Sequence, residues 1–217
     1  MSIDGSPFTT PDRQPPSTDL PPTTFARTAP GIPVGVTANP SLDRVTALDR
    51  VQRAGIEVRR VRLRDVPRLT RLQRRAFPKR LAYSGPTLFG LALLPAIGFL
   101  VAVRGRDVLG CAIGDRSGLD ARVINIAVDP DARRQGLAAA LLFELEEALP
   151  GGDMILMVQR ENDGAHDLYR RAGYVDVGLA PAYYGPGRDG IWMRKHRPSS
   201  PAPMGGTDDR IYRPYPR

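Results

Sequence analysis

The chain has 217 residues, 41% of them hydrophobic and 25% charged, which suits one globular domain with additional tails. Its one cysteine, Cys111, excludes an internal disulfide, and with only two histidines the sequence offers no cysteine–histidine metal cluster. The net charge of +8 comes largely from residues 43–80, where thirteen Arg or Lys stand against four Asp or Glu.

A basic segment of this kind could face RNA, a ribosome or an acidic cofactor. No aromatic stacking platform is interleaved with it, so nucleic acid is not the expected partner. We expect Cys111 to be a small buried residue. A secretory signal has a basic region followed by an apolar one, and the first sixteen residues lack this pattern. Together with the single cysteine, this predicts a cytoplasmic protein.

The two ends of the chain differ in composition from its middle. Residues 1–42 are rich in Pro, Ser and Thr with few large apolar residues, and residues 198–217 have the same character. Such segments bury too little apolar surface to offset the entropy lost on ordering. We therefore expect two disordered tails around one folded domain at 55–196.

The expected domain begins with a strand and a helix. Residues 57–64 alternate in the manner of a strand, with Val61 and Leu63 on one face. Asp65 is expected to cap a helix that runs to Phe77. Its apolar residues recur at helical spacing, and proline is tolerated in its first turn.

Residues 81–103 carry no charge and are long enough to cross a bilayer. Glycines and prolines interrupt the segment, and polar residues dilute its start. We therefore expect a short buried helix at 86–94 and a buried strand at 97–103 rather than a membrane span.

The remaining elements alternate strands and helices. A Gly-Arg-Asp turn within 99–115 joins two strands. The elements expected after it are strands at 121–128 and 154–160, helices at 134–149 and 162–173, and two last strands at 174–181 and 190–195. The order is strand, helix, helix, three strands, helix, strand, helix, strand, strand.

The turn after the strand at 121–128 reads Arg133-Arg134-Gln135-Gly136-Leu137-Ala138. The first amides of a helix have no internal partner, and the helix dipole adds partial positive charge there. Gly136 and Ala138 leave no bulk over those amides, and the arginines supply counter-charge, so the turn is suited to a pyrophosphate. It lacks the Gly-Lys-Ser/Thr ending of a nucleoside triphosphate loop and the three glycines of a dinucleotide fold.

These residues resemble the acetyl-CoA loop of the GNAT acetyltransferases: Arg or Gln, two residues, Gly, one residue, Gly or Ala. Here the pattern falls on Arg133, Gly136 and Ala138. A second family block is matched by Asn162 and, seven residues later, Tyr169 in "NDGAHDLYRRAGY". The resemblance extends over residues 57–195. It implies an α/β GNAT fold, with a mixed, mostly antiparallel sheet flanked by helices, and an acetyl-CoA-dependent N-acetyltransferase.

The resemblance also implies roles for individual residues. The strand Ile126-Ala127-Val128 would offer its backbone to the pantetheine arm and the thioester oxygen. Asn162 would bind the cofactor's amide arm and cap a helix, and Tyr169 would be the acid that protonates the departing thiolate. The implied cofactor-binding residues are Ile126, Ala127, Val128, Arg133, Arg134, Gln135, Gly136, Leu137, Ala138, Ala139 and Asn162. No metal is implied. His166 lies off the apolar face of its helix and is expected at the surface.

Three stretches, "LQRRAFP", "INIAVDPDARRQGLA" and "AYYGPGRDGIWM", are similar to the bacterial ribosomal-protein N-terminal (alanine) acetyltransferases. That similarity implies a protein or peptide N-terminus as the acceptor, with Phe77, Tyr183 and Tyr184 near it. One position departs from the subfamily, since Met157 stands where its general-base glutamate is expected. A thioether cannot usefully accept a proton.

The general base therefore stays open between Tyr183 or Tyr184, Glu161 and a water molecule. Two other functions also stay open at this point. One is acetylation of a small-molecule amine. The other is a GNAT fold without catalysis that binds acetyl-CoA and uses the basic segment to bind RNA or a ribosome. The acceptor, the oligomeric state and the role of the tails are not determined by the sequence.

Overall fold

The computed structural model describes residues 40–197, with side chains from residue 44 onward. Residues 1–39 and 198–217 of the expected tails lie outside the described residues and stay predictions, whereas residues 40–42 begin a helix. The strands are β1 (Glu57–Arg60), β2 (Gly98–Arg104), β3 (Asp107–Ser117), β4 (Asp120–Val128), β5 (Met154–Gln159), β6 (Val175–Ala180) and β7 (Gly190–Lys195). The helices are α1 (Pro40–Arg53), α2 (Val66–Ala76), α3 (Gly85–Leu93), α4 (Leu137–Ala148) and α5 (Asp163–Arg171), with short 3-10 turns η1 (Leu63–Asp65) and η2 (Pro130–Ala132).

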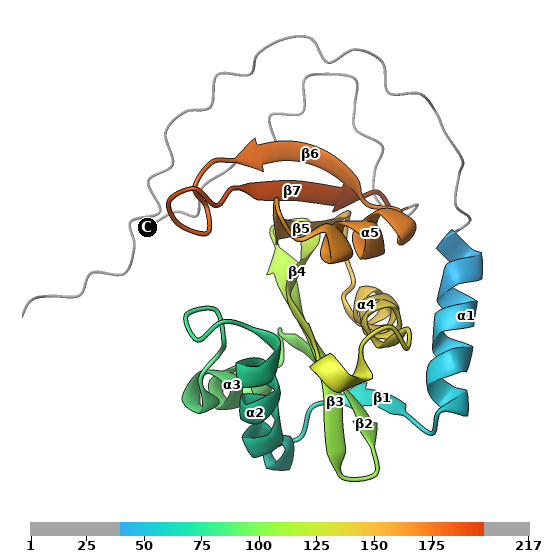
Figure 1. The fold of residues 1–217 in the computed structure, drawn as a ribbon. Coiled ribbons are helices and arrows are strands. Elements are labelled where there is room, and N and C mark those ends of the chain that lie inside the picture. The colour runs from blue at the N-terminus through green and yellow to red at the C-terminus, as the bar shows by residue number, and fades with distance from the viewer. Residues whose placement is uncertain (1–39, 198–217) are drawn as a thin grey trace, which may run out of the picture. The chain divides into compact units, whose positions relative to one another are not determined.

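The strands form one seven-stranded sheet in the order β1-β2-β3-β4-β5-β7-β6 (Figure 1). Every neighbouring pair is antiparallel except β4 and β5, which are parallel. Helices lie on both faces, α2 and α3 on one and α4 on the other (Figure 1). The predicted mixed, mostly antiparallel sheet flanked by helices is confirmed.

Two hydrophobic cores lie on opposite faces of this sheet, because successive side chains of a strand point to opposite sides. On β2, Leu100 and Ala102 join the core under α1 and α4, whereas Phe99 and Val101 join the core under α2 and α3. Cys111 belongs to the second core and is 0% exposed. Its burial raises the pKa of the thiol to about 12, so the expected small buried residue is confirmed.

The first predicted strand is wrong in its second half. The strand ends at Arg60, and Leu63 lies in η1 with 46% of its surface exposed. The reason is Asp65, whose carboxylate accepts hydrogen bonds from the Arg62 backbone N–H (2.8 Å) and the Arg59 guanidinium (2.8 and 3.1 Å). Asp65 therefore closes the turn before α2 and makes no side-chain cap on the helix itself.

The uncharged segment forms α3 and β2, as expected, and the predicted buried strand is confirmed. The predicted burial of the helix is wrong: Leu88 is its one buried residue, while Phe89 and Leu93 are 46% and 55% exposed. Within residues 40–197, no helix has the length and apolar character needed to cross a membrane.

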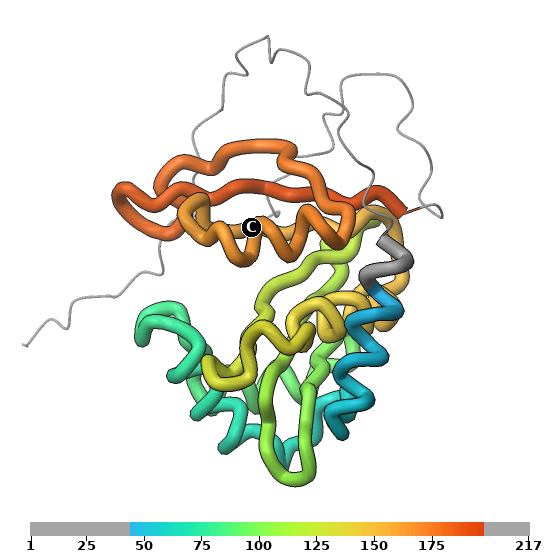
Figure 2. The backbone as a smooth tube through the Cα atoms, turned by 45° about the vertical axis from the view of Figure 1, so that its right-hand side comes forward, coloured from blue at the N-terminus to red at the C-terminus, as the bar shows by residue number. Residues whose placement is uncertain are grey.

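Helix α1 was not among the predicted elements. It packs beside α4 and buries Ala47 and Val51 in the first core (Figures 1 and 2). Arg44 of α1 also forms an ion pair of 2.6 Å with Glu147 on α4. The helix predicted at 134–149 begins only at Leu137, because the residues before it form a turn with two positive φ angles.

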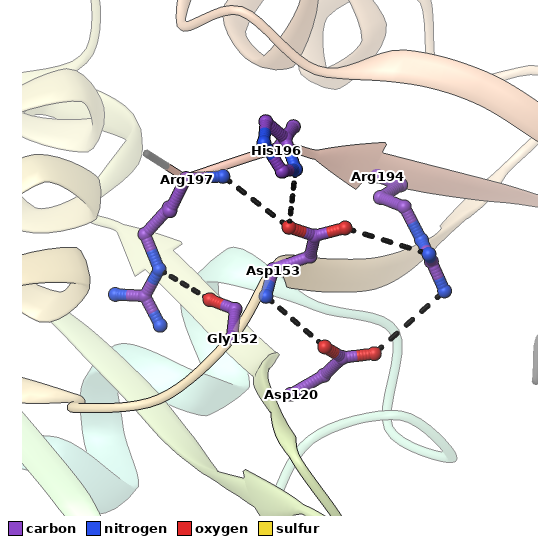
Figure 3. A network of polar contacts seen from close by, with 6 residues as sticks. All are labelled: Asp120, Gly152, Asp153, Arg194, His196 and Arg197. Atoms are coloured by element: carbon purple, nitrogen blue, oxygen red, sulfur yellow. Dashed lines mark hydrogen bonds and ion pairs between the residues drawn. The ribbon is translucent and has the colours of Figure 1, made fainter. Parts of the chain in front are cut away.

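A network of polar contacts joins the end of β7 to the starts of β4 and β5 (Figure 3). The Asp153 carboxylate contacts His196 Nδ1 at 2.9 Å, Arg194 Nη1 at 3.4 Å and the Arg197 backbone N at 3.3 Å. The Asp153 backbone N–H donates to the Asp120 carboxylate at 3.0 Å. These contacts fix the end of β7 to the starts of β4 and β5, so this end of the sheet is held together.

His166 is buried in α5 with 6% of its surface exposed, so its predicted surface position is wrong. Both ring nitrogens are buried without a hydrogen-bond partner among the described residues. A buried polar atom without a partner loses its hydration and gains nothing in exchange. His166 therefore weakens the native state at this position.

We expect His166→Leu to raise the free energy of unfolding by about 1–3 kcal/mol, because leucine fills a similar volume without burying unpaired nitrogens. Urea unfolding followed by circular dichroism measures the change. His196→Leu is the matched control, since His196 contacts Asp153 and its replacement brings no gain. A lower stability for His166→Leu would contradict the assignment.

Candidate functional site

The sheet opens between its two parallel strands. β4 and β5 pair only from Ala121 and Met154 to Val123 and Leu156. The shift in register between β3 and β4 leaves Ile124 as an extra residue on β4, a bulge at the point where the two strands separate. Figure 1 shows β5, β6 and β7 turned away from β1 to β4. Beyond the bulge, the β4 backbone is therefore unpaired on its β5 side within residues 40–197.

The strand predicted to hold the pantetheine arm lies along this opening. Ile126 and Val128 are half-buried, whereas Ala127 points its side chain into the second core and is 2% exposed. The side chains thus pack on both faces while the backbone edge stays available, as backbone recognition of a ligand requires.

The turn after β4 presents a row of backbone amides. Arg134 and Gly136 have φ angles of 61° and 85°, and Gly136 is the N-cap of α4. The first helical hydrogen bond runs from the Ala140 N–H to the Gly136 carbonyl, at 3.0 Å. Within the described part of the chain, the amides of residues 134–139 have no hydrogen-bond acceptor. Such amides at a helix N-terminus, with the partial positive charge of the dipole, are suited to a phosphate.

A cavity of about 590 Å³ opens beside this turn, between α1, α4 and α5. Four arginines line it, Arg50, Arg133, Arg134 and Arg171, with Asp167 as the one carboxylate in its lining. None of these arginines forms an ion pair with another described residue. The cavity is therefore positively charged and fits the phosphate-rich end of acetyl-CoA.

Most of the predicted cofactor-binding residues line this cavity: Val128, Arg133, Arg134, Gly136, Leu137, Ala138 and Ala139. Ile126, Ala127, Gln135 and Asn162 are outside its lining. The Asn162 side chain caps α5 by accepting a hydrogen bond from the Ala165 N–H at 3.2 Å, as predicted. Its contact with a cofactor stays a prediction.

The prediction missed the walls that α1 and α5 contribute. Thr46, Ala47 and Arg50 come from α1, and Asp167 and Arg171 from α5. In the sequence, α1 is indicated only by Ala47 and Val51, two apolar residues one helical turn apart that become buried. Two residues are a short pattern in an otherwise polar segment.

Tyr169 lies on α5, 8% exposed, with its ring edge-on to Tyr174 at 5.7 Å between centroids. Burial raises the pKa of its hydroxyl to about 12. The hydroxyl has no hydrogen-bond partner among the described residues. At neutral pH it is therefore a proton donor, and since it is a weak acid it depends on close positioning for any catalytic effect.

Tyr184 has three tyrosines near enough to affect its pKa, Tyr183, Tyr169 and Tyr83. The Tyr184 hydroxyl donates to the Met157 carbonyl at 3.0 Å, and the Tyr183 and Tyr184 rings meet edge-on at 5.0 Å. Burial raises the pKa of Tyr184, and the neighbouring Tyr183, Tyr169 and Tyr83 raise it further. The fold thus brings the predicted residues Tyr169 and Tyr183 near Tyr184, and it adds Tyr83, which the sequence did not suggest.

Three further residues singled out by the sequence lie differently: Phe77 near the acceptor, Met157 at the position of the expected base and Glu161 as a candidate base. Phe77 is half-buried and packs against the second core. Met157 is half-buried on β5 and lies so close to Gly190 that a side chain there would collide with its thioether. Glu161 is exposed in the turn between β5 and α5.

The carboxylates beside the tyrosines are already engaged. Asp115, which contributes to the raised pKa of Tyr83 after the larger effect of burial, accepts two bonds from Arg122 at 3.0 and 2.7 Å. Asp189 accepts from the Ala182 N–H at 2.9 Å. Among the described residues, no cluster of His, Cys, Asp or Glu could hold a metal ion.

Known proteins similar to this chain include several N-acetyltransferases. The model of the acetyltransferase (GNAT) family matches residues 66–174. An uncharacterized N-acetyltransferase of Methanocaldococcus jannaschii is 28% identical over 152 residues, which cover 68% of this chain and 96% of that protein. The N-alpha-acetyltransferase RimI of Mycobacterium tuberculosis is 40% identical over 74 residues, 34% of this chain and 47% of RimI.

Among solved structures, the ribosomal-protein-S18-alanine N-acetyltransferase of Escherichia coli superposes with a TM-score of 0.57. It is 25% identical, and the match covers 70% of this chain and 99% of that one. Helix α1 lies outside the residues that the family model matches.

Proposed function

The chain belongs to the GNAT family of acetyltransferases and is an acetyl-CoA-dependent N-acyltransferase, and from this premise we propose that its acceptor is the α-amine of a protein or peptide N-terminus. The observation that carries the proposal is the chemistry of the region around Tyr169, Tyr183 and Tyr184. It offers phenols and the Met157 thioether, and the carboxylates of Asp115 and Asp189 beside it are bonded elsewhere.

An acceptor for such a site must lose its proton readily. An α-amine has an ordinary pKa of about 7.7–8.0 and a lysine amine about 10.4, so at neutral pH only the former supplies a useful neutral fraction without a strong base. The names of two similar proteins agree with this choice: one is an N-alpha-acetyltransferase and the other acts on the alanine of ribosomal protein S18.

Different residues bind the cofactor, stabilise the developing charge and donate the proton. The amides of residues 134–139, with Arg133 and Arg134, hold the pyrophosphate of acetyl-CoA. The open backbone edge at residues 126–128 lies along the pantetheine arm and stabilises the negative charge that develops on the thioester oxygen. As the amine nitrogen bonds to the carbonyl carbon and the carbon–sulfur bond breaks, Tyr169 gives its proton to the departing thiolate. The proton that the amine nitrogen loses passes through water back to the Tyr169 oxygen and restores its acid form.

The test is acetylation of matched peptides, followed by mass spectrometry. We expect a lysine-free peptide with a free N-terminus to be acetylated, and its Nα-blocked, lysine-containing counterpart to be at least about tenfold slower near pH 7, because a lysine amine is about 2.5 pKa units more basic. The value of kcat/KM rises with pH as the α-amine deprotonates and levels off above about pH 8. A small polyamine that is acetylated faster than every peptide would overturn the proposal in favour of small-molecule acetylation.

A further inference from the structure

Helix α1 forms one wall of the cofactor cavity. It lies before the residues that the family model matches. We propose that Arg50 on this wall binds the 3′-phosphate of acetyl-CoA. The inference rests on the acetyl-CoA site described above, whose pyrophosphate lies over residues 134–139. It adds a phosphate-binding residue that the sequence pattern of the turn does not contain.

The first support is the close approach of α1 to the turn. A side chain placed on Gly136 would lie 3.7 Å from Arg50 Cδ and 3.9 Å from the Cα and carbonyl oxygen of Ala47. Ala47 and Val51 anchor α1 in the first core at 6% and 2% exposure. The packed helix α1 therefore holds the aliphatic stem of Arg50 beside the turn at residues 134–139.

The second support is charge. Arg50 lines the cavity, and its guanidinium has no ion-pair or hydrogen-bond partner among the described residues. Its neighbour Arg53, one helical turn further, contacts Asp49 at 3.9 Å, is 84% exposed and does not line the cavity. On the opposite wall, Arg171 Nε already donates to the Asp167 carbonyl at 3.1 Å. Of the two arginines on the helical walls, Arg50 is thus the one with all of its guanidinium donors uncommitted among the described residues.

The third support is the chemistry of the cofactor. Acetyl-CoA carries a pyrophosphate and, on the ribose, a separate 3′-phosphate. The amides of residues 134–139 with Arg133 and Arg134 match the first of these groups. The second needs its own counter-charge, and the guanidinium fork of an arginine fits phosphate oxygens with two parallel hydrogen bonds. Arg50 reaches the cavity from α1, a different element from the turn that binds the pyrophosphate.

The experiment is calorimetric titration of the full chain and of Arg50→Gln with CoA and with 3′-dephospho-CoA. We expect Arg50→Gln to bind CoA about tenfold or more weakly, in line with the loss of a charged hydrogen bond. Wild type and variant should bind 3′-dephospho-CoA equally well, because that ligand lacks the group that Arg50 contacts.

Arg53→Gln is the matched control, with the same change on the same helix outside the cavity, and we expect it to bind both ligands like the wild type. Thermal unfolding verifies that each variant is folded. Unchanged CoA affinity in Arg50→Gln would overturn the proposal, and so would an equal loss for the two ligands, which would place Arg50 on the pyrophosphate. A wild-type chain that bound neither ligand would refute the acetyl-CoA site itself, and this assignment with it.

Discussion

Gly136→Glu is expected to weaken acetyl-CoA binding by about 100-fold or more. Gly136 has a φ of 85° and is the N-cap of α4, in the middle of the amides without acceptors at residues 134–139. A glutamate there places negative charge where the pyrophosphate binds, and forfeits several charge-assisted hydrogen bonds worth about 1.5–3 kcal/mol each. Calorimetry with acetyl-CoA measures the loss.

Gly136→Ala separates charge from backbone strain. A Cβ at this position meets nothing closer than 3.7 Å, so alanine does not block the turn. The left-handed conformation costs a non-glycine residue about 1–2 kcal/mol, which lowers stability in both variants. We expect Gly136→Ala to retain most of the affinity. Unchanged affinity in a folded Gly136→Glu variant would refute a phosphate site at this turn.

Tyr169→Phe is expected to lower kcat by about 10²- to 10⁴-fold, the usual range for loss of a general acid, while the Kd for acetyl-CoA changes little. Phenylalanine keeps the ring that packs beside Tyr174, so only the hydroxyl is removed. Steady-state kinetics and calorimetry on the same preparation give the two numbers.

The pH profile gives an independent readout of the same residue. Burial raises the pKa of Tyr169 to about 12, so the acid form persists through neutral and moderately alkaline pH and is lost only as pH rises through that value. The wild-type kcat should therefore show no fall up to about pH 10. A fall centred between pH 7 and 9 would assign the acid role to another group.

Tyr174→Phe is the control for Tyr169→Phe. Its hydroxyl donates to Glu146 at 2.9 Å within the first core, so we expect lower stability with kcat largely retained. Full activity in Tyr169→Phe would exclude the acid role and favour protonation of the thiolate by water.

The sequence by itself determined the features that a few consecutive residues encode. The glycine turn before α4, the Asn162 cap on α5 and the break of the uncharged segment into α3 and β2 are all found as expected. Backbone freedom at glycine, side-chain capping and the period of apolar residues are local properties, so the chain reveals them without its fold.

Only the tertiary structure decided which distant segments complete the site. Arg50 lines the cavity because α1 packs on α4, and the fold brings Tyr83 close enough to Tyr183 and Tyr184 to raise the pKa of Tyr184. His166 lies off the apolar face of its helix, yet the fold buries it. Burial and long-range contact depend on how elements pack against one another, and that packing involves residues more than 80 positions apart, beyond the reach of any local pattern.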